Sequence, residues 1–210
     1  MAGSMNLVAK SCFPNAVLVT DRFHVQKLAL EAVQELRIKH RWEAIDKEND
    51  DIEKAKKHKK AYRPMIIENG DTIKQLLARS RYVLYKKQKT WTENQKLRAK
   101  LLFELYPDID EAYRLSQKLN WIFEQKEGKI YGYTRLAQWH EQVAKSGFKS
   151  FNTISRTIMN HYKTILNYFD NRSTNASAES FNAKIKAFRA QFRGVRNIEY
   201  FLFRLTKIYA

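Results

Sequence analysis

Apolar residues recur along most of the chain at intervals of three and four residues, the spacing that places them on one face of an α-helix. This spacing predicts helices over residues 1–13, 25–62, 70–87, 92–105, 108–125, 133–146, 150–169, 177–193 and 197–208. Thr92 and Gln95 have the spacing of a capping box, Gly128 and Gly132 predict a turn, and Gly147 is expected to end a helix. With 6 glycines and 3 prolines in 210 residues, the chain is predicted to be mainly α.

One segment departs from the helical spacing. Residues 16–20 form a short, continuous apolar run with a break before it and a charge after it. Such a run is typical of a strand buried on both faces, as in a sheet covered by helices. Because one strand cannot form a sheet, its partners are expected in another chain or in a larger protein, which is a first indication of a truncated domain.

The predicted helix over residues 177–193 carries two neighbouring stripes. Its apolar stripe consists of Ala178, Phe181, Ile185, Phe188 and Phe192. The second stripe begins with a carboxylate and continues with an amide and three cations: Glu179, Asn182, Lys186, Arg189 and Arg193. The helix dipole alone favours a carboxylate in the first turn. The alternative is that Glu179 binds a metal ion that faces a phosphate backbone, which the cations below it would also contact.

A second candidate carboxylate, Asp21, follows the predicted strand, and His24 lies three residues later. The end of a strand is a common position for catalytic or metal-binding groups, because the backbone there is rigid. The alternative is that Asp21 caps the next helix and that His24 packs or bonds locally. The spacing alone favours this local role.

The charge of the chain points to a polyanionic partner. The formal net charge is +17 and the pI is about 9.9, which is typical of proteins that bind nucleic acid. No apolar run approaches the ~20 residues that span a membrane, and no signal peptide is visible. The lone Cys12 excludes an internal disulfide and fits a reducing cytoplasm. Residues 46–60 are nearly all charged, acidic first and then basic, and form either a solvated face or a surface that follows DNA phosphates.

Two motifs, at opposite ends of the chain, resemble one family. Residues 21–24, after a buried strand, resemble the Asp/Cys-x-x-His signature of many DDE transposases. Residues 174–186, followed by residues 193–197, resemble the final glutamate motif of bacterial insertion-sequence transposases of the ISL3 family. The polar positions of that second motif are Asn175, Glu179 and Asn182. The resemblance extends over nearly the whole chain, in the same order.

The resemblance implies a ribonuclease H-like catalytic domain, in which two aspartates and one glutamate hold two Mg²⁺ (or Mn²⁺) ions. Residues 1–24 would be a remnant of its core, residues 25–170 an all-helical insertion, and residues 171–210 the late core helices. Glu179 would be the glutamate that binds metal, and DNA would be the partner. The residues expected to hold DNA phosphates are Lys186, Arg189, Arg193 and Arg196. The residues expected to support the site are Asp21, His24, Asn175 and Asn182.

The sequence departs from the family pattern in one respect, because no acidic residue precedes Asp21. The second aspartate of the family would come just before residues 1–5, or would be Asp21 itself. On either mapping the triad is incomplete, so we expect the chain alone to be inactive and to bind no metal. The alternative is a non-catalytic helical DNA-binding or assembly module, with RNA as another polyanionic partner.

Removal of the sheet would expose an apolar strand edge and one face of the glutamate helix. We therefore expect self-association, or partial order near residues 16–20. The expected location is the bacterial cytoplasm.

Overall fold

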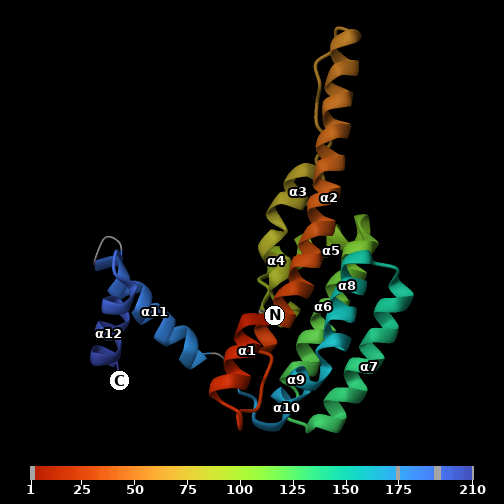
Figure 1. Cartoon of the computed structure of the whole chain (residues 1–210). Coiled ribbons are helices and arrows are strands. Elements are labelled where there is room, and N and C mark those ends of the chain that lie inside the picture. Colours follow the sequence, from red (N-terminus) through yellow and green to blue (C-terminus); the bar gives the residue numbers. More distant parts are fainter. Residues whose placement is uncertain (1–2, 174–175, 192–194, 210) are drawn as a thin grey trace. The chain divides into compact units, whose positions relative to one another are not determined.

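The computed structural model describes residues 3–173, 176–191 and 195–209, and these residues are mainly α-helical (Figure 1). The chain divides into two compact units, Met1–Asn171 and Arg172–Ala210. The helices of the first unit are α1 Gly3–Cys12, α2 Arg22–Lys57, α3 Ile73–Arg79, α4 Arg81–Tyr85, the 3₁₀ turn η1 Gln88–Thr90, α5 Glu93–Leu105, α6 Pro107–Glu124, α7 Lys129–Ser146, α8 Lys149–Asn160, α9 Tyr162–Leu166 and α10 Tyr168–Asn171. The helices of the second unit are α11 Ala176–Gln191 and α12 Ile198–Tyr209.

The core of the first unit forms around α2, which packs against α3, α4, α6 and α8. Val25, Ala29, Ala32 and Val33 are buried, and their spacing is that of one helical face. On α7, Trp139 is fully buried, and its indole N–H donates a 2.9 Å hydrogen bond to the Leu115 carbonyl oxygen. A buried indole with a satisfied N–H anchors a core efficiently, because its large apolar area is removed from water without losing a hydrogen bond.

Local chemistry sets several helix ends where the sequence predicts them. The capping box of Thr92 and Gln95 is present at the start of α5, and Thr72 and Gln75 form an equivalent box at α3. Gly147 ends α7 with a left-handed backbone conformation (φ 73°), which a residue without Cβ adopts at little cost. The prediction of a mainly α chain is therefore confirmed.

Two predicted helices are divided, and one predicted turn is helical. The helix predicted over residues 70–87 is divided into α3 and α4 at Ser80, whose hydroxyl donates to the Leu76 carbonyl oxygen at 2.7 Å. The helix predicted over residues 150–169 is divided into α8, α9 and α10. Gly132, predicted as part of a turn, lies inside α7 against the ring of Phe169.

The predicted strand over residues 16–20 is wrong, because the structure describes this segment as irregular and within the described residues the one β-type bridge joins Ile66 and Thr72. The segment lies beside α9 and the α9–α10 junction. The Thr20 N–H donates to the Thr164 carbonyl oxygen at 2.9 Å, and the Asn167 side chain donates to the Leu18 carbonyl oxygen at 2.9 Å. A strand needs a neighbouring extended backbone, and this segment instead bonds to single groups of a helical region.

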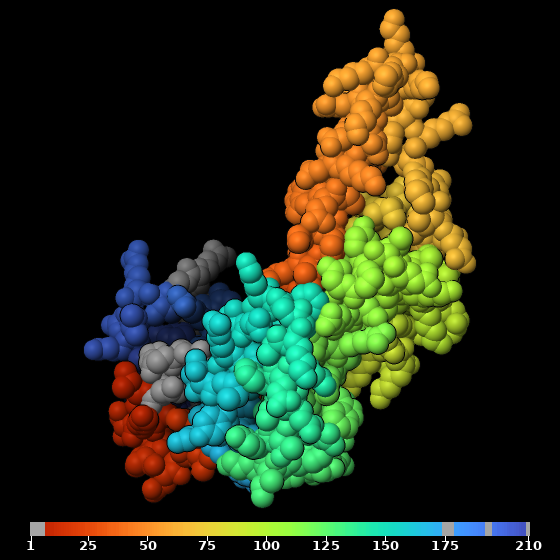
Figure 2. All heavy atoms as spheres, turned by 90° about the vertical axis from the view of Figure 1, so that its right-hand side faces the viewer, coloured from red at the N-terminus to blue at the C-terminus, as the bar shows by residue number. Residues whose placement is uncertain are grey.

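The second half of α2 extends away from the rest of the first unit and is followed by a segment that runs back along it (Figure 2). We call residues 46–66 the arm. Tyr62 lies close enough to Glu48 and Asp51 for their charges to raise its pKa, an effect that adds to the larger one of desolvation. The returning segment therefore lies along the acidic part of the helix.

Candidate nucleic-acid interface

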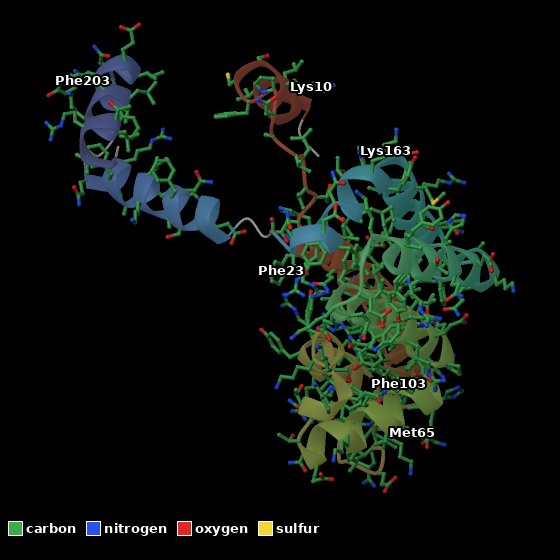
Figure 3. All side chains as sticks on the ribbon, turned by 90° about the horizontal axis from the view of Figure 1, so that it is seen from below. Lys10, Phe23, Met65, Phe103, Lys163 and Phe203 are labelled. Carbon is green, nitrogen blue, oxygen red and sulfur yellow. The ribbon has the colours of Figure 1, made fainter. Side chains whose placement is uncertain are left out.

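The second unit holds its two helices together through an apolar contact. On α11 the buried Phe188 stacks on Phe201 of α12, with ring centroids 5.5 Å apart, and Leu205 of α12 is buried as well. Phe203 is 55% exposed and lies on α12 outside this contact (Figure 3). Of the α11 side chains whose burial the structure describes, Phe188 alone is buried and Ile185 is half-buried, so most of the helix is exposed, including Phe181 of the predicted apolar stripe.

The exposed face of α11 carries the polar stripe that the sequence predicts. Glu179 lies in the first turn and is exposed, as are Asn182, Lys186 and Arg189 at steps of three, four and three residues. These four side chains therefore share one side of the helix. A first-turn carboxylate is favoured by the helix dipole, and the last-turn Arg189 is favoured in the same way at the other end.

The other predicted phosphate-binding and support residues lie outside this stripe. Arg196 is exposed in the segment between α11 and α12, where it lines a small hollow of about 120 Å³ beside Phe188 and Tyr200. Asn175 and Arg193 lie outside the described residues. Of the nine predicted site residues, α11 thus brings together four, as a charged stripe that begins with a carboxylate.

Asp21 and His24 belong to the first unit. Asp21 is buried and is the N-cap of α2, where its carboxylate accepts a 2.8 Å hydrogen bond from the Phe23 N–H. Its carbonyl oxygen accepts from the His24 N–H at 3.2 Å, while the His24 side chain is exposed. Asp21 therefore has a structural task in starting the longest helix of the chain, which is the local role that the spacing favours.

The chain matches the transposase family DDE_Tnp_ISL3 over residues 1–205. The chain belongs to the ISL3 family of DDE transposases. Neither a curated protein nor a solved structure matches it. The match covers both units, so the helical first unit and the glutamate helix are parts of one family pattern.

Membership of the ISL3 family implies that DNA is the partner and that the active enzyme uses a divalent metal ion. Two-metal sites need several oxygen ligands that converge from different elements. Over residues 3–173, 176–191 and 195–209, no group of three or more His, Cys, Asp or Glu side chains is placed to hold a metal ion. Within the described part of this ISL3 chain, Glu179 therefore belongs to no such group of three.

The ISL3 chain also contains an acidic cluster that the sequence pattern does not reveal. His40 of α2 lies between two carboxylates, with Nδ1 2.9 Å from Glu43 and Nε2 2.6 Å from Asp108. Its ring lies 4.6 Å from that of Tyr106, and burial, followed by the charges of Glu43 and Asp108, raises the pKa of Tyr106. The spacing of His40 and Glu43 is visible in the sequence, whereas the contact with Asp108 depends on how α2 packs against α6.

None of the described helices in this ISL3 chain is both long enough and apolar enough to cross a membrane.

Proposed function

We propose that this ISL3 transposase chain takes part in cutting and joining DNA by phosphoryl transfer, with Glu179 as one carboxylate of the active site. The observation that carries the proposal is the exposed stripe of α11, which lies in the segment that resembles the family's final glutamate motif and within the residues that the family match covers. The stripe joins one carboxylate to an amide and two cations on one accessible face. Such a face can lie along a sugar-phosphate backbone, whereas a buried carboxylate cannot.

The cations of the stripe give the DNA strand its attraction to this face. A carboxylate and a phosphate repel each other, so Glu179 alone would drive the strand away. Lys186 and Arg189 lie farther along the same face and are exposed, so they can bind phosphates next to the position that Glu179 approaches. Arg196 and Arg193 extend this set in the proposal. These contacts position the strand and carry no sequence information.

The remaining carboxylates of the active site would come from outside the described residues. In this proposal, residues 1–24 and 171–210 belong to a ribonuclease H-like core, and residues 25–170 are its helical insertion. Asp21 and His24 support the site from the start of α2, as Asn175 and Asn182 do beside the glutamate. A single carboxylate does not complete a phosphoryl-transfer site, so the chain alone is inactive and is expected to self-associate.

The test replaces Glu179 in an ISL3 transposase that contains this chain together with both aspartates. We expect Glu179→Gln to lower the rate of DNA cleavage by at least ~100-fold and to change the DNA dissociation constant less than ~2-fold, because it removes charge and no phosphate contact. Glu199→Gln is the matched control, since Glu199 is also an exposed first-turn glutamate of the second unit. Cleavage is measured on labelled transposon-end DNA.

Two outcomes would contradict the role of Glu179, and a third would contradict the inactivity of the chain alone. Full cleavage by Glu179→Gln, or an equal loss by Glu199→Gln, would remove Glu179 from the active site. Cleavage of transposon-end DNA by the 210-residue chain alone, with Mg²⁺ or Mn²⁺, would show that the missing carboxylates lie within it.

The second candidate function is a non-catalytic helical DNA-binding or assembly module. It is favoured by the net charge of +17 and by the finding that the described residues contain no group of three or more His, Cys, Asp or Glu side chains that could hold a metal ion. A module of this kind would bind DNA equally well with Glu179→Gln and would leave the activity of the intact transposase unchanged by that substitution.

A further inference from the structure

Charge is divided sharply along the arm. Residues 46–53 contain five acidic residues and one lysine, whereas residues 54–63 contain six basic residues and no acidic one. All six basic side chains are exposed, and together we call them the basic tip: Lys54, Lys56, Lys57, Lys59, Lys60 and Arg63. The positive charge is therefore concentrated at the far end of the arm, beyond an acidic stretch of the same helix.

The basic tip gathers six exposed cations with few carboxylate partners on one short stretch of the chain. Some exposed lysines elsewhere in the first unit do pair along their own helices, as Lys27 does with Glu31 at 3.7 Å and Lys100 with Glu104 at 3.9 Å. Within the basic tip, Lys54 reaches Asp51 at 3.8 Å. Among the residues that the structure describes, the other five cations of the tip make no ion pair, so their charge is not neutralised within the protein.

The turn at the end of α2 places a lysine where glycine is usually favoured. Lys59 has a φ of 53°, and the Lys60 N–H donates to the Ala55 carbonyl oxygen at 2.9 Å, so the chain reverses immediately after the helix. A residue with a Cβ atom is disfavoured in this backbone conformation, which therefore costs free energy at Lys59. The Lys59 ammonium makes no ion pair among the described residues that would offset this cost. An unfavourable residue retained on an exposed turn points to a use for its side chain.

We propose that the basic tip is a second DNA-binding surface, which holds the phosphate backbone of duplex DNA without reading its sequence. The proposal rests on the proposed function only in taking DNA as the substrate. Lysine ammonium groups on flexible stems bind phosphates as point charges, and they give an electrostatic, sequence-independent contact. The carboxylates of residues 46–53 repel the same backbone, so they confine the contact to the end of the arm.

The test compares two variants of the 210-residue chain that lose the same charge. The tip variant replaces Lys56, Lys57, Lys59 and Lys60 with Gln. The control replaces four exposed lysines that pair with carboxylates on helices of the first unit: Lys27, Lys39, Lys96 and Lys100. Binding to a short fluorescent DNA duplex of arbitrary sequence is followed by anisotropy over a range of salt concentrations, and circular dichroism verifies that each variant is folded.

We expect the tip variant to bind DNA at least ~10-fold more weakly at moderate salt, with a slope of log K against log salt that is shallower by about 3. The control should change affinity less than ~3-fold and the slope by less than about 1, because its lysines are already neutralised. If the tip variant does not fold, Lys59→Gly removes one of the cations and places glycine where the positive φ favours it. The slope of log K against log salt should then be shallower by about 0.9. Equal losses in tip variant and control would overturn the proposal.

Two further measurements separate this surface from other partners and from the active site. Tighter binding of duplex RNA or polyglutamate than of duplex DNA, lost in the tip variant, would overturn the assignment to DNA. In an intact ISL3 transposase, the tip variant should retain its cleavage rate at saturating DNA, whereas Glu179→Gln should retain affinity and lose cleavage. If the tip variant keeps its DNA affinity, the proposal for the basic tip has failed. If Glu179→Gln keeps its cleavage rate, the proposed role of Glu179 has failed.

Discussion

The two halves of α2 are helical for different physical reasons. In the first half, Val25, Ala29, Ala32 and Val33 enter the core, and their burial holds the helix in place. Within α2, no residue after Arg37 is buried. The second half makes fewer tertiary contacts, among them those of His40 with Asp108 and of Glu48 with Lys74, and it also has local ion pairs and the turn at its end.

The boundary between the halves is a small polar network inside the core. The Arg37 guanidinium donates to the Gln34 side-chain oxygen at 2.7 Å and to the Leu77 carbonyl oxygen at 2.9 Å. Gln34 in turn donates to the Arg81 carbonyl oxygen at 3.1 Å. Burial lowers the pKa of Arg37, and the nearby Arg41 and Arg81 charges lower it further. Beyond this point no residue of α2 is buried, so most of its side chains can carry charge in contact with solvent.

The largest expected effect comes from placing the same carboxylate in each half. Ala29→Asp puts an unpaired charge at a fully buried position, and we expect it to cost at least ~4 kcal/mol of the free energy of unfolding. Ala55→Asp, at a partly exposed position near the basic tip, should cost about 0.5 kcal/mol or less, through helix propensity alone. Urea unfolding followed by circular dichroism measures both. Similar losses would show that the arm is as tightly packed as the first half.

A smaller effect is expected from one methyl group in the packed body. A Cβ at Gly132 would lie 2.8 Å from the ring of Phe169, which is buried and stacked on Phe123. The steric conflict in Gly132→Ala should therefore lower the free energy of unfolding by about 1–3 kcal/mol. The higher helix propensity of alanine should offset ~1 kcal/mol of that loss.

Gly128→Ala is the control for this substitution, since nothing lies within 4 Å of the position that its Cβ would occupy. We expect its midpoint temperature to change less than that of Gly132→Ala in thermal unfolding. A Gly132→Ala protein that is more stable than Gly128→Ala would mean that the Phe169 ring moves aside freely.

Gly132 also shows what the sequence can and cannot predict. The spacing of apolar residues identifies the helices, and the capping box at Thr92 marks a helix start, because both depend on neighbours three or four residues away. The glycine at position 132 is required by a residue 37 positions later, so its role inside α7 is invisible locally. The apolar run at 16–20 is misleading for the same reason, since its backbone partners lie on a distant helical segment.

The candidate site likewise has features that the sequence predicts and features that depend on the fold. The exposed stripe of α11 follows from helical periodicity, so Glu179, Asn182, Lys186 and Arg189 could be placed together from the sequence. The capping role of Asp21 was one of two local alternatives, and the structure supplies its hydrogen bond to the Phe23 N–H. The basic tip is visible as a lysine run, but its exposure, its unpaired charges and the backbone of Lys59 are properties of the folded arm.

The smallest effect is expected at the end of the arm, where the comparison between the halves of α2 is most direct. Lys59→Gly relieves a positive φ at a position without tertiary packing, and should stabilise the turn by up to ~1 kcal/mol. Amide exchange at Lys60, whose N–H closes the turn, should slow by up to about fivefold. The midpoint of urea unfolding should not move, because the arm contributes little to the core. A shift of the midpoint together with the exchange rate would mean that arm and body unfold as one unit, and that the two halves of α2 are coupled after all.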